Sequence, residues 1–135
     1  MKYLLDTNIL LELLLAQDRA DEVKTFLQTI PPAELCLSEF SLYSLGIILF
    51  RRQHHREFLK MTKDLQDNGI QLTRITANEL PNVASIAQQF SLDFDDAYQY
   101  AIAEKFNLTI VSFDHDFDRT KRSRKTPEEV LRELP

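Results

Sequence analysis

Short apolar segments alternate with amphipathic segments along the chain, and this alternation constrains the fold more than any other feature of the sequence. Each apolar run is short enough to be a strand, and the apolar spacing after it predicts one or two helices. Strands that alternate with helices indicate a parallel sheet with helices on both faces, an α/β fold. The expected strands are 2–5, 35–37, 70–75 and 108–113, and the expected helices are 7–16, 19–29, 38–52, 54–68, 77–90, 94–106 and 127–134.

Length and composition narrow the class of protein. At 135 residues the chain fits one domain, residues 1–135, with a single core. Its one cysteine, Cys36, lies in an apolar run and is expected to be a small buried hydrophobe. The only glycines, Gly46 and Gly69, exclude glycine-rich phosphate loops. No apolar run approaches the ~20 residues of a membrane span, so we expect a cytoplasmic protein without a membrane partner. The net charge of −5 argues against a generally basic surface.

Acidic residues stand where the predicted strands end. Asp6 follows the first strand and Glu39 follows the second. Asp114 follows the last strand, and Asp96 lies at the start of the helix before it. An N-cap explains any one of these residues taken alone, but carboxylates at successive strand ends repel one another unless a cation holds them. Because sites in open parallel sheets gather beyond the carboxyl ends of the strands, we predict a cation site at this edge.

The type of cation follows from the residues after the last strand. The spacing Asp114-x-Asp116-x-Asp118 imitates the opening of an EF-hand calcium loop. That loop requires glycine at its sixth position and glutamate at its twelfth, where this chain has Arg119 and Lys125. A few carboxylates with open coordination positions suit Mg²⁺ or Mn²⁺ instead.

Three stretches together resemble the PIN-domain family, and within it the VapC-type toxins of bacterial toxin–antitoxin pairs. They are MKYLLDTNILLELL at the start, Ser38-Glu39-Phe40-Ser41 in the middle, and LDFDDAYQYAIAEKFNLTIVSFDHDF near the end. The resemblance implies a PIN-like domain with a parallel sheet of about five strands. It implies an Mg²⁺- or Mn²⁺-dependent endoribonuclease that hydrolyses RNA phosphodiester bonds with a metal-activated water. It further implies a cognate antitoxin as partner, and dimers are usual among similar proteins.

The resemblance also implies roles for individual residues. Asp6, Asp96 and Asp114 match the catalytic, metal-binding carboxylates of the family, and Asp116 matches an auxiliary metal ligand. The side chains that lend polar support are Thr7, Asn8, Ser44 and Ser112.

One acidic residue of the family pattern is missing. The pattern places serine, threonine and glutamate three residues apart, whereas Ser38 is followed by Ser41 and Ser44. Glu39 is the tentative catalytic replacement, five positions before Ser44. Five helical residues rotate by about 500°, or ~140° away from the same face, so Glu39 would have to act from the strand–helix junction.

A basic run directly follows the acidic residues of the last strand. We interpret it as a grip on the RNA backbone, because such phosphate contacts position a strand without reading its sequence. A solvated loop is the alternative interpretation. The run consists of Arg119, Lys121, Arg122, Arg124 and Lys125.

Two other classes of protein remain as alternatives. A phosphoacceptor receiver domain also has aspartate at strand ends, but it normally has an acidic pair after the first strand, where Asp6 stands alone. A PIN-like module that binds RNA or protein with weak or no catalysis is favoured by serine at position 44. Cleavage of RNA with and without EDTA distinguishes this module from a nuclease.

Overall fold

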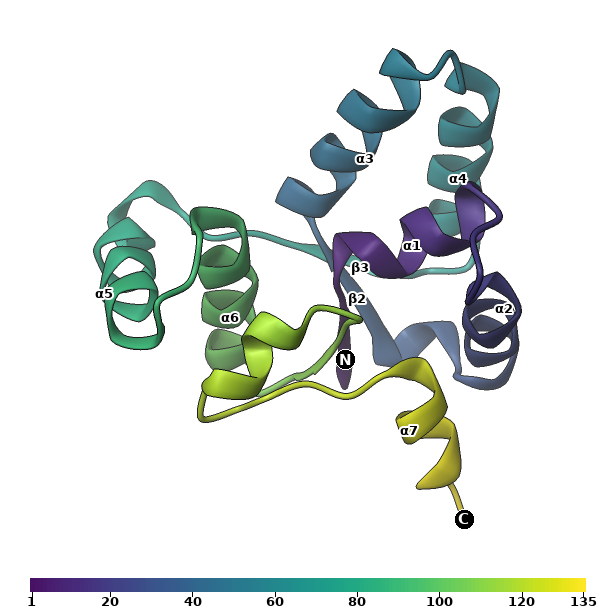
Figure 1. Ribbon diagram of the computed structural model, residues 1–135. Coiled ribbons are helices and arrows are strands. Elements are labelled where there is room, and N and C mark those ends of the chain that lie inside the picture. Colours follow the sequence, from purple (N-terminus) through teal and green to yellow (C-terminus); the bar gives the residue numbers. More distant parts are fainter.

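A parallel sheet forms the centre of the computed structural model, which describes residues 1–135 (Figure 1). The strands are β1 (Tyr3–Leu5), β2 (Leu35–Ser38), β3 (Gln71–Thr73) and β4 (Thr109–Val111). Their order is β3-β2-β1-β4, and each neighbouring pair is parallel. The predicted α/β class with a parallel sheet is therefore confirmed.

Helices follow the strands in the order that the alternation predicts. Ser38 begins α3 with a side chain that accepts from the Ser41 N–H at 3.0 Å, as an N-cap does. The segment 77–90, expected as one helix, divides at Leu80 into a 3₁₀ turn and α5. The helices are α1 (Thr7–Leu14), α2 (Ala20–Thr29), α3 (Glu39–Arg51), α4 (His55–Asp67), α5 (Leu80–Phe90), α6 (Phe94–Phe106) and α7 (Pro127–Arg132), with 3₁₀ turns at Pro32–Glu34, Ala77–Glu79 and His115–Arg119.

The sheet has four strands, so the expectation of about five was slightly too high. A fifth strand is reduced to a single parallel bridge between Lys125 and Val111. Ser123 just before it has a positive φ of 56°. Thr126 just after it caps α7, and Pro127 starts that helix. A turn and a helix start therefore leave no room for a longer strand beside β4.

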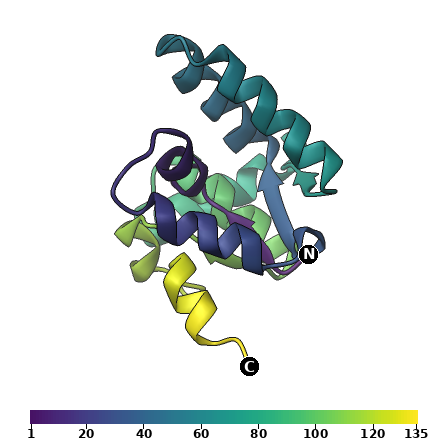
Figure 2. The ribbon, with the colours of Figure 1, turned by 90° about the vertical axis from the view of Figure 1, so that its right-hand side faces the viewer.

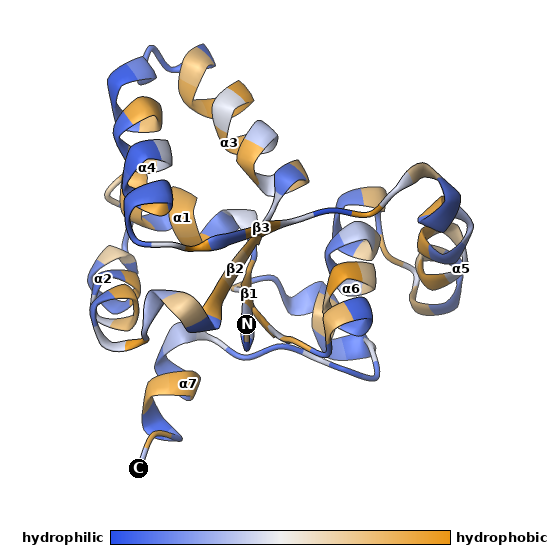
Figure 3. Ribbon diagram, turned by 180° about the vertical axis from the view of Figure 1, so that it is seen from behind, coloured by the Kyte–Doolittle hydropathy of each residue, from blue (hydrophilic) through white to orange (hydrophobic).

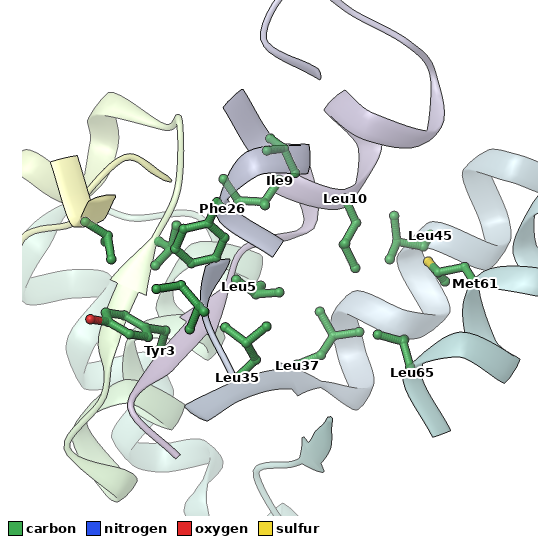
Figure 4. Packing of buried hydrophobic residues seen from close by; sticks show 14 residues of the cluster. Tyr3, Leu5, Ile9, Leu10, Phe26, Leu35, Leu37, Leu45, Met61 and Leu65 are labelled. Carbon is green, nitrogen blue, oxygen red and sulfur yellow. The ribbon is translucent and has the colours of Figure 1, made fainter. Parts of the chain in front are cut away.

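Alternate strand residues face two separate hydrophobic clusters, one on each side of the sheet. Leu5 and Leu37 belong to the cluster under α1, α2 and α4 (Figure 4). Leu4 and Cys36 belong to the cluster under α5 and α6, where Cys36 is fully buried as predicted. Figure 1 shows α5 and α6 on one side of the strands and α1 and α2 on the other. Helices on both faces explain why every residue of β1 and β2 is buried and why most of them are hydrophobic (Figure 3).

Helices α3 and α4 form an antiparallel pair that extends away from the sheet (Figure 2). A Cβ atom added at Gly46 on α3 would lie 3.2 Å from the Phe58 ring on α4. Glycine therefore allows the two helices to approach closely at this point. None of the helices combines the length and the hydropathy that a membrane span requires.

Candidate metal centre

The carboxyl ends of β1 and β4 bring residues from distant parts of the chain to one edge of the sheet. Asp6 directly follows β1, and Asp114 comes shortly after β4. Asp96 lies in the first turn of α6, and Asp116 in the 3₁₀ turn after β4. Carboxylate oxygens of Asp96, Asp114 and Asp116 lie within 4.8 Å of one another. We call these three residues the carboxylate cluster.

Asp6 lies beside this cluster and is held by three hydrogen bonds. Its Oδ1 accepts from the Thr7 N–H at 2.9 Å and from Gln99 Nε2 at 3.2 Å, and its Oδ2 accepts from the Ser112 hydroxyl at 2.6 Å. A carboxylate oxygen has two acceptor sites, so Oδ1 is saturated and Oδ2 retains one. Burial raises the pKa of Asp6 despite these bonds, and the charge of Asp114 adds to the rise. Asp6 can therefore offer one further contact, through Oδ2.

The Ser112 hydroxyl connects the ends of β1 and β4. Besides donating to Asp6, it accepts from the Asp114 N–H at 2.9 Å and from Asn8 Nδ2 at 3.3 Å. Asn8 also accepts the Phe113 N–H through Oδ1 at 3.3 Å. Ser112 and Asn8 thereby fix the position of Asp6 relative to Asp114.

Asp114 and Asp116 share a tight turn. The side chain of Asp114 accepts from the Asp116 N–H at 2.8 Å and begins the 3₁₀ turn His115–Arg119. Asp116 forms an ion pair with Arg119 at 3.0 Å, whereas Asp114 has no cationic partner. Helix capping, the alternative to metal binding, thus accounts for one of the two oxygens of the Asp114 carboxylate.

Capping does not explain Asp96. The N-cap of α6 is Asp93, and the Asp96 side chain forms no ion pair. Asp96 is only 8% exposed. Its burial, followed by the charges of Asp114, Asp95 and Asp6, raises its pKa to about 8. A buried carboxyl among like charges is the arrangement that a cation relieves.

The donor atoms of the site select the type of cation. The cluster consists of carboxylate oxygens and contains neither histidine nor cysteine. Hard oxygen ligands suit Mg²⁺ and Mn²⁺, which keep several bound waters and use only a few carboxylates. The residues present therefore fit a divalent hard cation.

The two candidates for the missing acid lie outside the cluster. Glu39 is the first residue of α3, is half-buried and is not part of the carboxylate cluster. Ser44 lies farther along α3, is half-buried and makes no side-chain hydrogen bond. The catalytic role of Glu39 therefore stays a prediction.

The structure adds two polar residues that were not among the predicted site residues, Gln99 and Ser41. Gln99 is 2% exposed and donates through Nε2 to the Ser41 hydroxyl at 2.7 Å as well as to Asp6. Ser41 also accepts from the Thr7 hydroxyl at 2.9 Å. Gln99 is the one amide in the buried segment 96–103 of α6 and comes three residues after Asp96. An amide at that position, in a segment that is otherwise apolar after Asp96, was the sequence feature that could have predicted its place in the site.

The basic run does not form one face. Arg119 pairs with Asp116 and donates to two backbone carbonyls at the carboxyl end of α5, those of Phe90 and Ser91. Arg124 donates to both carboxylate oxygens of Asp118 and to the Ser112 carbonyl, at 3.1–3.2 Å. The Arg124 guanidinium accordingly holds the pKa of Asp118 below its usual value.

The other three cations of the run lie farther from the cluster. Arg122 donates to the Asn107 side chain, and Lys125 pairs with Glu133. Lys121 is exposed without an ion-pair partner. Arg122 and Lys121 line a polar cavity of about 580 Å³ that also includes Leu108 and Thr109, so it lies at the amino end of β4, away from Asp114.

The fold and the carboxylate cluster at the carboxyl edge define a small α/β protein with a metal-type acidic centre. The family model for the PIN domain matches residues 3–123. The chain therefore belongs to the PIN domain family.

Solved structures of similar fold span nearly the whole chain. VapC20 of Mycobacterium tuberculosis, a Sarcin-Ricin loop cleaving toxin, has a TM-score of 0.75 at 20% identity, covering 87% of this chain and 93% of its own. A toxin–antitoxin complex from Klebsiella pneumoniae has a TM-score of 0.73 at 21% identity, covering 93% and 98%. VapBC2 of Rickettsia felis, bound to a DNA fragment from its promoter, has a TM-score of 0.72 at 16% identity, covering 93% and 97%. No curated protein sequence gave a match.

Proposed function

We propose that this protein is an Mg²⁺- or Mn²⁺-dependent endoribonuclease of the VapC toxin type. The observation that carries the proposal is the meeting of Asp96, Asp114 and Asp116 within 4.8 Å at the carboxyl edge of a PIN fold. Neither Asp96 nor Asp114 has a cationic partner within the chain, so the negative charge of the site is available to a cation. An acidic pocket without a cation would repel the phosphates of RNA, whereas a loaded pocket attracts them.

Asp96 and Asp114 would hold the cation, with Asp6 and Asp116 as further ligands. A divalent cation bound there supplies charge stabilisation at the scissile phosphate and a more acidic bound water. Asp6 has one free acceptor position, on Oδ2, because its other positions accept from Thr7, Gln99 and Ser112. These three donors keep the carboxylate in place, so it needs little reorganisation when a cation binds.

We also propose a cognate antitoxin as partner, and a homodimer as the assembled toxin. Two of the similar structures are toxin–antitoxin complexes, one from Klebsiella pneumoniae and VapBC2 from Rickettsia felis. Both align over 93% of this chain and over 97–98% of their own, so nearly the whole of their fold is present here. Such a pair would act in the cytoplasm, where RNA is accessible.

A catalytically weak or inactive PIN-like binding module is the second candidate. Two observations favour it: Ser44 stands where the family pattern has glutamate, and Arg119 already neutralises part of the charge of Asp116. Both reduce the negative charge available to a cation.

Cleavage of single-stranded RNA tests the two candidates. We expect cleavage in Mg²⁺ or Mn²⁺, loss of cleavage in EDTA, and loss in Asp114→Asn at unchanged thermal stability. Asp18→Asn is the matched control, because Asp18 is exposed and has no side-chain partner. RNA that is bound but never cut in either metal would favour the binding module, and cleavage that persists in EDTA would exclude the proposed metal centre.

A further inference from the structure

An aromatic ring lies exposed at the start of the helix that bears Asp96. Phe94 is the first residue of α6 and is 54% exposed. The segment that follows is buried without interruption from Asp96 to Ala103. Phe94 is thus an exposed ring at the end of α6 that lies nearest the carboxylate cluster.

Two other aromatic rings pack against Phe94. Its ring centroid lies 5.9 Å from that of Phe40 and 6.1 Å from that of Tyr98, and these two lie 5.3 Å apart. Tyr98 is buried, and its hydroxyl accepts from the Ile75 N–H at 2.8 Å. The Phe94 ring is therefore held in place by fixed neighbours, which lowers the entropic cost of stacking another ring on it.

The other exposed aromatic residues do not share this position. Tyr43, which is 63% exposed, lies on α3 more than a turn after Glu39 and packs on no other aromatic ring. Phe106 lies at the opposite end of α6. Phe50 lies near the far end of α3 and packs against His55 and Phe58. Among the exposed aromatic side chains, Phe94 alone shares a helical turn with a member of the carboxylate cluster.

The charges around Phe94 favour a neutral ring as its partner. Asp93 and Asp95 flank it in the sequence, and Glu39 precedes Phe40. These acids repel phosphate, whereas the π-face of a nucleobase carries no net charge. The cations of the basic run are mostly paired within the chain, as described above. Recognition of single-stranded RNA beside Phe94 would therefore depend on base stacking more than on phosphate contacts.

The geometry of the edge indicates which base would stack. Residues two apart on a helix point to different sides, about 200° apart, so Phe94 and Asp96 project from opposite sides of α6. Asp96 faces Asp6 and Asp114, which follow β1 and β4, whereas Phe94 packs on Phe40, which follows β2. A single-stranded RNA that lies along the carboxyl edge of the sheet would therefore pass from the carboxylate cluster to Phe94.

We infer that Phe94 is a stacking platform for a base of single-stranded RNA that flanks the scissile phosphate on the β2 side. Arg74, which follows β3 at the same edge, is exposed and makes no ion pair, and it offers a phosphate contact beyond the platform. This inference rests on the proposed ribonuclease function, because it places the platform relative to a phosphate at the cluster.

Binding of a short RNA tests the platform. The full-length protein is titrated in Ca²⁺ in place of Mg²⁺, so that a hard cation neutralises the carboxylate cluster, into a single-stranded RNA that carries 2-aminopurine. Anisotropy reports affinity and quenching reports stacking. We expect Phe94→Ala to weaken binding about tenfold and to abolish the quenching, and Phe94→Trp to retain both. Phe106→Ala is the matched control on the same helix and should bind like the native protein. On an RNA with an abasic position in place of the stacked base, Phe94→Ala should cause no further loss.

Four outcomes would overturn the platform. One is native affinity and quenching in Phe94→Ala. Another is a Phe94→Ala protein that binds RNA normally but changes from dimer to monomer in light scattering, since the ring would then be covered by a second copy of the chain. A native protein that binds no RNA would overturn the ribonuclease proposal as well, whereas native binding that is insensitive to Phe94 would overturn only the platform. If Phe94→Ala does not fold, loss of quenching in a folded Phe94→Trp would also count against it.

Discussion

The carboxylate cluster and the basic run are neighbours in the sequence, but the structure treats their charges in opposite ways. Arg119, Arg122, Arg124 and Lys125 all have side-chain partners within the chain. Asp96 and Asp114 have no cationic partner, although Arg119 and Arg124 lie in the same part of the molecule. Cations that already pair within the chain are occupied, whereas the buried Asp96 and the half-buried Asp114 remain available to a ligand. The acidic residues of this stretch are therefore the ones that we propose to be functional.

The path of the chain explains why the cations are occupied. After the 3₁₀ turn the chain turns back at Ser123 and pairs with β4 through Lys125. Arg124 and Lys125 then lie beside the end of the sheet, within reach of Asp118 and Glu133. Lys121 and Arg122 make no ion pair, but both line the cavity at the amino end of β4, away from the carboxylate cluster. The RNA contact of the basic run stays a prediction.

The largest effect should follow from removing a charge of the cluster. We expect Asp96→Asn to weaken Mn²⁺ binding by more than about a hundredfold, since it removes a buried carboxylate ligand. Isothermal titration with Mn²⁺ measures this loss, and Asp18→Asn is the control. Unchanged Mn²⁺ affinity in Asp96→Asn would show that the unpaired carboxylate has no role in binding metal.

The same substitution should change the pH dependence of stability in metal-free buffer. The folded protein raises the pKa of Asp96 from its ordinary value of 3.8 to about 8. The folded state therefore binds this proton more tightly than the unfolded state, so its contribution to stability is present below about pH 4 and is lost as the pH rises toward 8. Urea unfolding at pH 5 and pH 9 should show a smaller drop in Asp96→Asn than in the native protein. An equal drop in both proteins would assign the pH dependence to other groups.

Removing a paired cation of the basic run should lower the free energy of unfolding. The Arg124 side chain is 9% exposed, and its loss removes the guanidinium that donates to Asp118 and to the Ser112 carbonyl. We expect Arg124→Met to lower the free energy of unfolding by about 2 kcal/mol, because a hydrogen-bonded charge is removed from a largely buried position. Lys121→Met, at an exposed unpaired cation, should change it by less than about 0.5 kcal/mol. Similar values for the two variants would erase the distinction between paired and unpaired cations.

A smaller effect is expected where a neutral side chain supports the acidic site. Gln99→Met keeps the length of the side chain but removes the donor to Asp6 and Ser41. We expect about a tenfold loss of Mn²⁺ affinity, as for other residues that orient a metal ligand. Gln88→Met, on the exposed face of α5, is the matched control. A loss of thermal stability without a loss of Mn²⁺ affinity would give Gln99 a purely structural role.

The smallest change should come from adding charge to the cluster side. Ser44→Glu places a carboxylate at the position where the family pattern has one, and partial exposure there limits its effect to about 1 kcal/mol or less. We expect a several-fold gain in Mg²⁺-dependent cleavage, measured on the same RNA as the native protein. Glu39→Gln is the companion variant. Fast native cleavage that is insensitive to both substitutions would show that the site is complete without a second acid.

The sequence by itself determined the order of the elements and the edge of the sheet at which the carboxylates meet. Periodicity of apolar residues is a local property, so strands and helices could be located from it. Parallel strands all end at one edge, so Asp6 and Asp114 had to share that edge once the topology was known. Our proposal that the cluster binds a metal rests on the same convergence of carboxylates at that edge.

Only the tertiary structure decided which charges are paired and which residues support the site. The partners of Arg119 and Arg124 depend on how the chain turns at Ser123, which no local pattern reports. Gln99 lies in a helix that is buried all round, so periodicity does not say which side chain faces Asp6. The expected fifth strand is a single bridge at Lys125, because the turn at Ser123 and the cap of α7 at Thr126 take up the residues on either side. Contacts of this kind form between segments far apart in sequence, and their geometry exists only in the folded chain.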